Sequence, residues 1–335
     1  MHMLVGLAMA AIVAAAAIFS FSPRPTPPLA PWHLPVERMQ LNTLARSGQG
    51  LVAGGELGHI LLSADGGKTW TDAAVTPRRY ALINQIVFAD ERTGMAVGHE
   101  GSILRTEDGG KSWREVAFDE QNGVPLMSIA KLPSGQWLAV GAFGRAQRSS
   151  DDGKTWEKFK LEGNEDLHLN RLVKGKDAKD WLLVGEHGLV RRSGDGGATW
   201  TAVPAFYNGS FYNAAQLDGG TWLVHGMRGN VYRSSDAAAH WTKSEMPAPI
   251  STFASARSAD GRRLLVGQSS MVLASTDDGA TFRIQRRGGL TTLMDIAVMP
   301  DGSWLLPSDF GLQRLDPAAA ANSANARPAA TGAKQ

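Results

Sequence analysis

Short apolar runs recur along the chain in a fixed order, separated by turns that contain glycine. Residues 51–62, "LVAGGELGHILL", and 95–105, "MAVGHEGSILR", each read as an apolar run, a Gly-centred turn and a second alternating run. Alternation with a period of two is typical of β-strands, and two such runs around a glycine turn predict a hairpin. A further apolar run precedes each hairpin, as in residues 83–90 and 293–300. The pattern therefore predicts an all-β protein of many short strands.

An eight-residue box follows each hairpin and divides the chain into repeats. "SADGGKTW" (63–70) recurs in similar form at 106–113, 149–156 and 193–200, and more weakly at 234–241 and 275–282. The closing aromatic residues are 41 to 44 residues apart. A period of this length with four strands per repeat is the sequence signature of a β-propeller blade. The structural residues that we assign to the boxes are Asp65, Asp108, Asp151, Asp195, Asp236, Asp277, Trp70, Trp113, Trp156, Trp200 and Trp241.

The repeats predict a seven-bladed β-propeller in which each box is the turn between the third and the fourth, outermost strand. Ser, Thr and Asp hold tight turns by bonding to local backbone N–H groups, and the aromatic residue is expected to pack between neighbouring sheets. Box five has Ala238 where the others have glycine, so we expect a looser turn there. The seventh copy, 293–316, lacks a box and an outer strand. We expect residues 32–38 to supply that strand and close the ring, because an open sheet edge invites aggregation.

The two ends of the chain differ from the repeats. Residues 3–21 are apolar and uncharged, so segment 1–22 is either a cleaved signal peptide or an uncleaved N-terminal membrane anchor. Both alternatives place the propeller, residues 32–315, outside the cytoplasm, in a periplasm or on a lumenal side. Residues 23–31 are a Pro-rich linker, and the Ala-rich residues 316–335 are expected to be a disordered tail.

The composition of the chain argues against several classes of function. The formal net charge is +2 at pH 7, which argues against a nucleic-acid-binding protein. The chain has no cysteine, which excludes disulfides and Cys-based metal or nucleophile sites. We assign no metal site, because His99 and His187 lie in turns of two different blades, and we expect no cofactor.

The tandem boxes and the string "AVGHEGSILRTEDGGKSW" (96–113) resemble the photosystem II stability/assembly factor family of Asp-box, or BNR-repeat, propellers. The resemblance spans about residues 32–315. It implies a seven-bladed propeller that helps a membrane complex to assemble on its lumenal side. Similar proteins of non-photosynthetic bacteria look like accessories of membrane transporters. The family also implies an arginine-rich patch that contacts the client protein.

Candidate partner-binding residues follow from the loops on one face of a propeller. Arg and aromatic side chains are favoured at protein-binding hot spots, and they gather in the predicted D-to-A connections and B-to-C turns, with strands labelled A to D from the inside outward. The candidates are Arg78, Arg79, Tyr80, Arg228, Arg286 and Arg287. A second arginine set precedes the boxes, and we expect its members to pair with neighbouring residues; it consists of Arg105, Arg148, Arg192, Arg233 and Arg314.

The box aspartates are spread around the ring, too far apart to act as one catalytic group. A sialidase-like glycoside hydrolase remains the alternative, since such enzymes also carry Asp-boxes. That class needs an arginine triad, a tyrosine nucleophile with a Glu partner and an acid-base Asp. The chain has only four tyrosines, and its boxes are more regular than sialidases show. We therefore predict a monomeric, non-catalytic propeller that binds an integral membrane protein or membrane complex.

Overall fold

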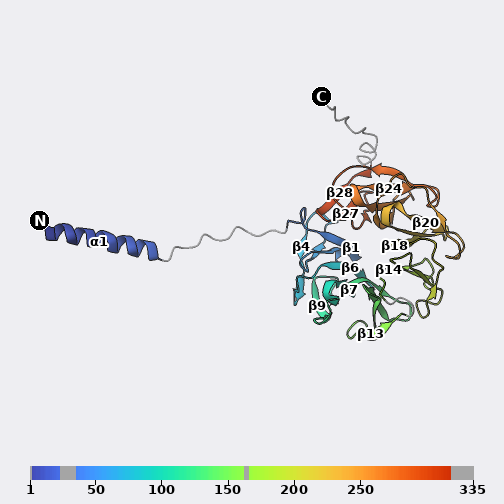
Figure 1. The fold of residues 1–335 in the computed structure, drawn as a ribbon, viewed down its shortest axis with the longest axis horizontal. Coiled ribbons are helices and arrows are strands. Elements are labelled where there is room, and N and C mark those ends of the chain that lie inside the picture. The colour runs from blue at the N-terminus through green and yellow to red at the C-terminus, as the bar shows by residue number, and fades with distance from the viewer. Residues whose placement is uncertain (1, 23–34, 162–165, 318–335) are drawn as a thin grey trace, which may run out of the picture. The chain divides into compact units, whose positions relative to one another are not determined.

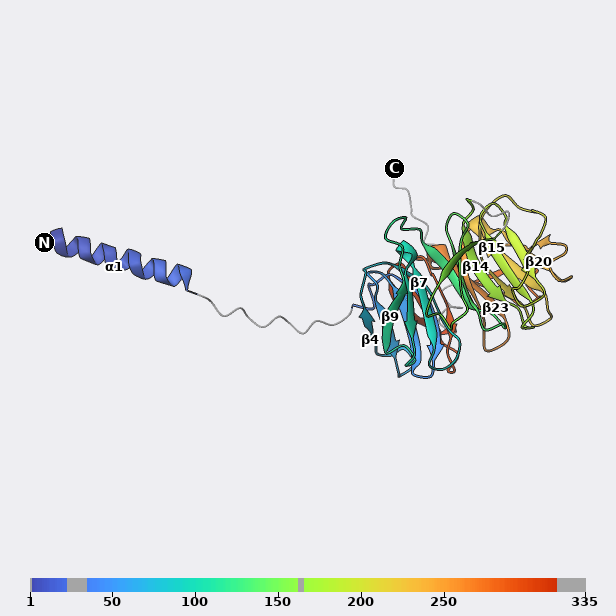
Figure 2. The same ribbon diagram turned by 90° about the horizontal axis from the view of Figure 1, so that it is seen from below.

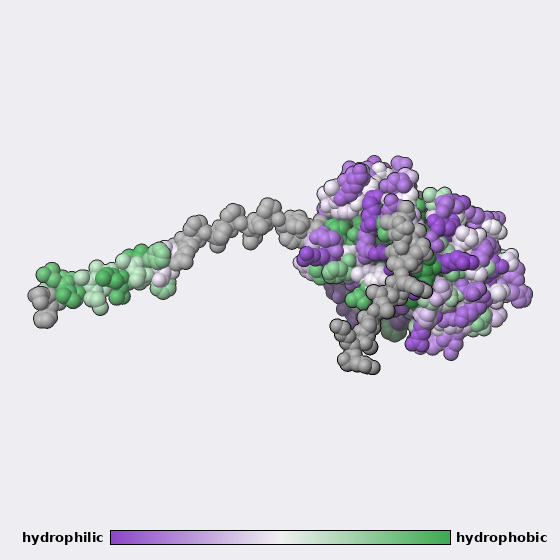
Figure 3. Space-filling view, turned by 90° about the horizontal axis from the view of Figure 1, so that it is seen from above, coloured by the Kyte–Doolittle hydropathy of each residue, from purple (hydrophilic) through white to green (hydrophobic). Residues whose placement is uncertain are grey.

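The computed structural model describes residues 2–22, 35–161 and 166–317. The chain divides into two units, Met1–Leu34 and a second unit that begins at Pro35. In the first unit, helix α1 (His2–Phe21) contains an uncharged stretch, Met3–Phe21, that is long and apolar enough to cross a membrane. Its surface is hydrophobic along its length (Figure 3). The predicted linker 23–31, residues 32–34 and residues 318–335 of the predicted tail lie outside the described residues.

Seven antiparallel sheets surround a central axis in the second unit, which confirms the predicted seven-bladed propeller (Figure 1). Figure 2 shows the strands of the blades from the side of the ring. In blades 1 to 6 the chain runs outward in sequence order from an inner strand A to an outer strand D, and the sheet of blade 7 has strands A to C.

The strands have the following bounds. Blade 1 contains β1 (Leu41–Ser47), β2 (Gly50–Gly55), β3 (Ile60–Ser63) and β4 (Thr71–Asp72). Blade 2 contains β6 (Ile83–Phe88), β7 (Gly94–Gly98), β8 (Ile103–Thr106) and β9 (Ser112–Ala117), with β5 (Ala74–Thr76) added at its edge. Blade 3 contains β10 (Leu126–Lys131), β11 (Trp137–Gly141), β12 (Arg145–Ser149) and β13 (Glu157–Lys160). Blade 4 contains β14 (Leu169–Lys174), β15 (Trp181–Gly185), β16 (Val190–Ser193) and β17 (Thr201–Ala202).

The remaining three blades follow the same order. Blade 5 contains β18 (Phe211–Gln216), β19 (Trp222–Gly226), β20 (Val231–Ser234) and β21 (Thr242–Lys243). Blade 6 contains β22 (Thr252–Arg257), β23 (Arg263–Gly267), β24 (Val272–Ser275) and β25 (Arg283–Arg286). Blade 7 contains β26 (Ala297–Val298), β27 (Trp304–Ser308) and β28 (Gly311–Leu315). Three 3₁₀ turns, His99–Gly101, Met227–Gly229 and Gln268–Ser270, lie between strands B and C of blades 2, 5 and 6.

Strand β5 is a feature that the repeat pattern did not predict. After β4, the chain crosses to the next blade and pairs in parallel with β9, the outer strand of blade 2. Val75 lies opposite Trp113 in this pairing. The outer edge of blade 2 is therefore covered by its neighbour, which removes one exposed row of backbone groups.

The hydrophobic core lies between the blades. One cluster joins Val52 and Ile60 of blade 1 to Ala96 and Leu104 of blade 2, with Trp113 of box two among them. Equivalent clusters between other neighbouring blades contain Trp156, Trp200, Trp241 and Phe282 of the later boxes. These box aromatics thus lie between neighbouring sheets, where burying such a ring contributes to the stability of a blade pair.

The N-terminal part of the propeller unit contacts the last blade, though residues 35–39 form a turn rather than a strand. The backbone N–H groups of Gly311 and Leu312 donate to the carbonyls of Met39 and Val36, respectively. The expected strand over 32–38 is therefore wrong for residues 35–38, and residues 32–34 lie outside the described residues. Pro35 begins this turn, and its fixed φ and missing N–H suit a turn better than a strand. Ring closure also uses Trp70, which packs against Leu305 of blade 7.

All six boxes have the same hydrogen-bond pattern. The first Ser or Thr donates to one carboxylate oxygen of the box Asp at 2.7–2.8 Å, and that Asp accepts the backbone N–H four residues later. In box four, hydrogen bonds from the Thr199 side chain and backbone lower the pKa of Asp195 to about 2. The six aspartates are thus ionised acceptors inside their own turns, which is the structural role expected of them.

Box five keeps this turn despite Ala238. Ala238 adopts φ +68° and donates its N–H to Ser234, as glycine does in the other boxes. The expectation of a looser turn is therefore wrong, because the hydrogen bonds of the turn are kept. Trp156 donates its indole N–H to Gly153, but the indole nitrogen of Trp241 has no partner among the described residues. Trp241 instead stacks on Phe206, with 5.0 Å between ring centroids.

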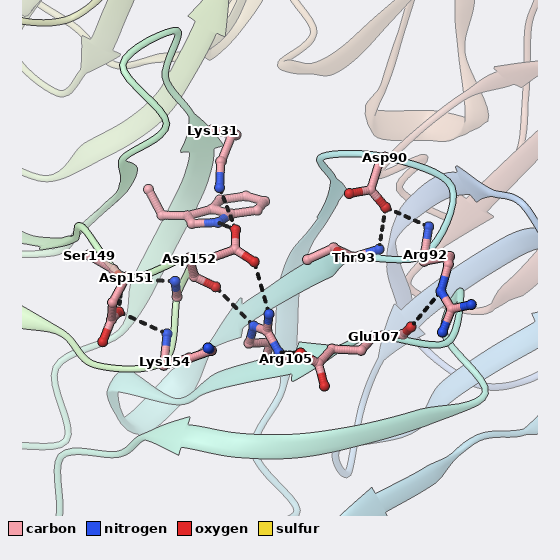
Figure 4. A network of polar contacts seen from close by, with 12 residues as sticks. Asp90, Arg92, Thr93, Arg105, Glu107, Lys131, Ser149, Asp151, Asp152 and Lys154 are labelled. Carbon is pink, nitrogen blue, oxygen red and sulfur yellow. Dashed lines mark hydrogen bonds and ion pairs between the residues drawn. The ribbon is translucent and has the colours of Figure 1, made fainter.

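The arginines that precede the boxes lie as expected, beside neighbouring residues, and three of them join adjacent blades. Arg105 of blade 2 donates to the backbone carbonyl and the carboxylate of Asp152 in box three, both at 2.9 Å. Figure 4 shows Arg105 and Lys131 reaching Asp152 from two sides. Arg233 and Arg314 reach the equivalent residues of boxes six and one, Asp278 and Gly66. The arginine of blade 7 therefore also helps to close the ring.

Replacing Arg105 is expected to weaken the contact between blades 2 and 3. The Arg105→Met variant loses the two hydrogen bonds to Asp152, and we expect a loss of about 1–2 kcal/mol in the free energy of unfolding. Urea denaturation measures this loss. The control is Arg148→Met, because Arg148 pairs with Glu157 of its own blade in an exposed ion pair. Equal losses for the two variants would contradict a role in joining blades.

Candidate partner-binding face

One face of the ring is formed by the B-to-C turns and the D-to-A connections, and we call it the loop face. In blades 1 to 6, the tip of each B-to-C turn is an exposed residue with φ between +52° and +59°. The tips are Leu57, Glu100, Phe143, His187, Arg228 and Ser269. The left-handed backbone at each tip directs one side chain of each blade into the solvent, so the face carries a ring of different side chains.

The tips are held by the connection that leaves the same blade. In blades 3 to 6, the residue after the tip donates its N–H to a carbonyl of that connection at 2.6–2.7 Å. These hydrogen bonds run from Gly144 to Leu167, from Gly188 to Gly209, from Gly229 to Ile250 and from Ser270 to Thr291. Because backbone groups fix every one of these turns, the loop face is preorganised for binding.

Large exposed hydrophobic residues of the described propeller, residues 35–161 and 166–317, all lie on this face. Their relative exposures are 53% for Leu57, 72% for Tyr80, 61% for Phe143, 101% for Leu290 and 60% for Phe310. The opposite face, which carries the boxes, has none among the described residues. The exposed large hydrophobic residues of the described propeller are therefore distributed on one side only.

Four of these side chains belong to neighbouring blades where the two ends of the ring meet. Leu57 and Tyr80 form an isolated antiparallel bridge, so the tip of blade 1 and the connection to blade 2 are adjacent. Backbone N–H groups of Thr292 and Asp309 bind the connection that carries Leu290 to the turn that carries Phe310. We call Leu57, Tyr80, Leu290 and Phe310 the apolar sector.

Arg78 does not project freely from the loop face. Its guanidinium donates to Asp72 at 2.6 Å and to the carbonyl of Ala73 at 3.1 Å, and it lies 3.1 Å from Nδ1 of His59. These contacts fix the connection after blade 1 against its own blade. Arg78 therefore has a supporting position within the propeller.

Arg79 and Arg286 are also engaged within the propeller. Arg79 forms two hydrogen bonds of 3.1 Å with Glu115 and lies over the ring of Phe118, and hydrogen bonding to Glu115 raises its pKa. Arg286 donates two hydrogen bonds to Gln313, and burial lowers its pKa. Of the six predicted residues, Tyr80, Arg228 and Arg287 have exposed side chains that are free of such contacts in the described residues.

A buried ion pair fixes the loop face between blades 2 and 3. Arg145, at the start of β12, binds Asp119 in the connection after β9, and both side chains are less than a tenth exposed. Asp119 also accepts from the backbone of Asn122. The hydrogen bond from Arg145 is the main reason why the pKa of Asp119 falls to about 2.

Sequence reasoning did not single out Leu57 or Leu290. Leu57 carried a usable signal, because it precedes Gly58 as Phe143 precedes Gly144 and Arg228 precedes Gly229 in the other hairpins. Leu290 follows two glycines in a connection without a repeat pattern, so nothing in its sequence marked it as exposed.

The geometry defines a class of protein, an Asp-box β-propeller with seven blades. The family model described as "Photosynthesis system II assembly factor YCF48" matches residues 80–249, about half of the chain. The chain therefore belongs to the photosystem II assembly factor family. No curated protein matches it in sequence.

Solved structures show the same fold at low sequence identity. "YCF48 bound to D1 peptide" has 20% identity and a TM-score of 0.65, covering 87% of this chain and 98% of the other. "YCF48 from Cyanidioschyzon merolae" has 14% identity and a TM-score of 0.66, covering 85% and 98%. A streptogramin B lyase has 13% identity and a TM-score of 0.70, covering 84% and 95%. The fold alone is thus shared by binding proteins and by an enzyme.

Proposed function

We propose that this protein is a non-catalytic scaffold outside the cytoplasm whose loop face binds an exposed segment of an integral membrane protein. The observation that carries the proposal is the position of the exposed hydrophobic side chains, all on the loop face of the described propeller. Arg287, in the connection that carries Leu290, adds an exposed cationic side chain to the same loop. Aromatic and Arg side chains of this kind dominate the energy of protein interfaces.

Two further observations support a membrane-protein client. One similar structure, of a family member, is bound to a D1 peptide, which favours a peptide segment as the group recognised here. Helix α1 is apolar enough to hold the chain at a membrane, as an anchor or during export. A tethered propeller meets a membrane protein at a raised effective concentration. The client is then a photosystem II subunit or another membrane complex, such as a transporter, that is assembled or assisted by the scaffold.

A binding role also agrees with the state of the box aspartates. Each one is used by the hydrogen bonds of its own turn, as Asp195 is by Thr199, and none is left as a proton donor or nucleophile. A sialidase-like activity would need carboxylates that converge on one substrate. The loop face, and not the box face, is therefore where we expect contact with a partner.

The lack of cysteine makes a direct test possible. Single variants Tyr80→Cys and Phe310→Cys on the loop face and Lys68→Cys in box one, each in the full chain, carry a photo-crosslinker in native membranes. We expect the two loop-face positions to crosslink to the same integral membrane protein, identified by mass spectrometry, and Lys68→Cys to give no such product. Crosslinks from Lys68→Cys alone, or from all three positions equally, would overturn the proposal.

A matched set of substitutions checks the energetics of the same face. The triple variant Tyr80→Ser, Leu290→Ser and Phe310→Ser removes exposed apolar surface, so we expect an unchanged melting temperature and a loss of the crosslinked product from an introduced Cys at Leu57. A Lys68→Ser variant serves as the control. Retention of the product by the triple variant would show that the apolar sector does not bind the client.

A further inference from the structure

The third residue of the inner strand in blades 1 to 6, together with Asp295 just before β26 in blade 7, forms a belt around the axis that is polar except at Ala254. The belt residues are Thr43, Gln85, Ser128, Arg171, Asn213, Ala254 and Asp295. Four of them accept a backbone N–H from the inner strand of the next blade, at 2.8–3.3 Å. These acceptors are Thr43 for Ile86, Gln85 for Ile129, Ser128 for Leu172 and Asp295 for Leu44. An acceptor at this position therefore joins successive blades.

Arg171 of blade 4 departs from this arrangement. A guanidinium has five donors and no acceptor, so it cannot take the N–H of Ala214 in the next blade. That N–H is bound instead by the side chain of Asn213, at 2.8 Å. Within residues 35–161 and 166–317, no hydrogen bond or ion pair is formed by the Arg171 side chain, and burial lowers its pKa. A cation thus occupies a belt position without the joining role of the others.

The charge of Arg171 lies near the axis of the ring. Arg171 belongs to the inner strand β14, which borders the axis (Figure 1), and Asp295 belongs to blade 7 on the opposite side of the ring. Both oxygens of Asp295 are already bound by backbone N–H groups, those of Leu44 and Ile296. Asp295 therefore already binds backbone groups of blades 1 and 7, and no hydrogen bond joins it to Arg171 in the described residues.

The approach from the loop face is short. Arg171 is the third residue of β14, and inner strands begin at the loop face, so its Cα lies about 7 Å below that end of the strand. The side chains one position nearer the face include Asn170, which donates to the carbonyl of Phe211, and Tyr212, which stacks on Phe253 with 5.0 Å between centroids. An extended group of one or two residues spans this depth.

We propose that Arg171 anchors an axial binding site for a carboxylate, which enters from the loop face and pairs with the guanidinium. A carboxylate fits because two parallel N–H···O bonds match the guanidinium fork. Arg171 is partly exposed, so its donors can be reached from solvent. The carboxylate is carried by a small organic acid or by the C-terminus of a peptide. The site is independent of the client-binding proposal.

Thermal unfolding of the full chain in low-salt buffer tests the site with three probes. These are acetate, N-acetyl-trialanine with a free carboxylate, and the same peptide as its C-terminal amide. We expect the free-carboxylate peptide to raise the melting temperature and the amide to leave it unchanged. A shift with acetate as well would identify a small acid as sufficient, and a shift with the peptide alone would identify a chain terminus. Equal responses to acid and amide would overturn the proposal.

Substitutions separate binding from a purely structural role. Arg171→Met is expected to abolish the shift while leaving the melting temperature of the free protein nearly unchanged, because Arg171 is partly exposed and its side chain forms no hydrogen bond in the described residues. Arg171→Lys keeps the charge and loses the fork, so about tenfold weaker binding is expected. Lys174→Met, at the exposed end of the same strand, should behave as the wild type. A destabilised Arg171→Met variant that keeps the carboxylate response would assign Arg171 a structural role and contradict the site.

Discussion

Gly98→Ala is expected to destabilise the propeller by about 3 kcal/mol, because the added methyl group meets a backbone oxygen. A Cβ at Gly98 would lie 2.1 Å from the carbonyl oxygen of Leu82 and 3.2 Å from Cα of Ile83. The Leu82 carbonyl also accepts the N–H of His99. Relief of the clash would therefore separate β7 from β6 and break the hydrogen bond that starts the B-to-C turn.

The same close approach recurs in six blades. The stability loss measured for Gly98→Ala would therefore apply to the equivalent glycines of the other blades. Glycines that end the B strands would place a Cβ 1.9–2.3 Å from a carbonyl oxygen at the start of the inner strand. They are Gly55, Gly98, Gly141, Gly185, Gly226 and Gly267. Urea denaturation of Gly98→Ala measures the loss, and Gly194→Ala is the control, because a Cβ at Gly194 meets nothing within 4 Å. A loss below that of the control would show that the strands yield easily at this point.

Asp119→Ala is expected to cost about 2–3 kcal/mol, because it leaves Arg145 without its partner. The guanidinium of Arg145 is 9% exposed, so water cannot fully replace the carboxylate. The loss falls on the connection between blades 2 and 3 at the loop face. Glu157→Ala removes one partner of an exposed ion pair in blade 3 and is the control, with an expected change of about 0.5 kcal/mol or less.

The effect of Asp119 should depend on pH in a defined direction. Its pKa in the folded protein is about 2, below the value of about 3.9 in an unfolded chain. A lowered pKa in the folded state stabilises the protein above the unfolded pKa, and this contribution is lost as the pH falls through the folded pKa. The difference in unfolding free energy between the wild type and Asp119→Ala should therefore be full at neutral pH and decrease from about pH 4 to pH 2. A pH-independent difference would assign the loss to packing alone.

Most of the fold could be predicted from the period of the sequence repeat. Boxes with a fixed order of Ser or Thr, Asp and an aromatic residue form the same turn wherever they occur, so their spacing placed strands C and D of six blades. Local chemistry was less informative where the chain leaves the repeat. Residues 35–39 share their composition with outer strands, yet Pro35 and the two backbone hydrogen bonds to β28 produce a turn. Strand β5 depends on the edge that blade 2 offers, which no local pattern records.

The candidate site could be located only in part from the sequence. The sequence was sufficient to place Arg and Tyr residues in the loops of one face. It did not show the partners of each arginine, because those partners are distant in the chain. Glu115 lies 36 residues from Arg79, and Gln313 lies 27 residues from Arg286. These contacts turn predicted contact residues into internal supports. Arg171 was overlooked for the opposite reason, since it sits in an ordinary strand and only the ring shows that its belt neighbours are acceptors.

The loop tips have a consequence for how a partner is oriented. Seven nearly equivalent blades would offer a partner seven rotational settings of similar energy if their tips were alike. The tip side chains differ in charge, size and polarity, from Glu100 to Phe143 and Arg228, while their backbone conformation stays the same. Because the tip side chains differ while the tip backbones are alike, the seven rotational settings of a partner differ in energy, and one of them is favoured. It also allows single tips to change during evolution without disturbing the ring, so the same frame can be adapted to a new partner.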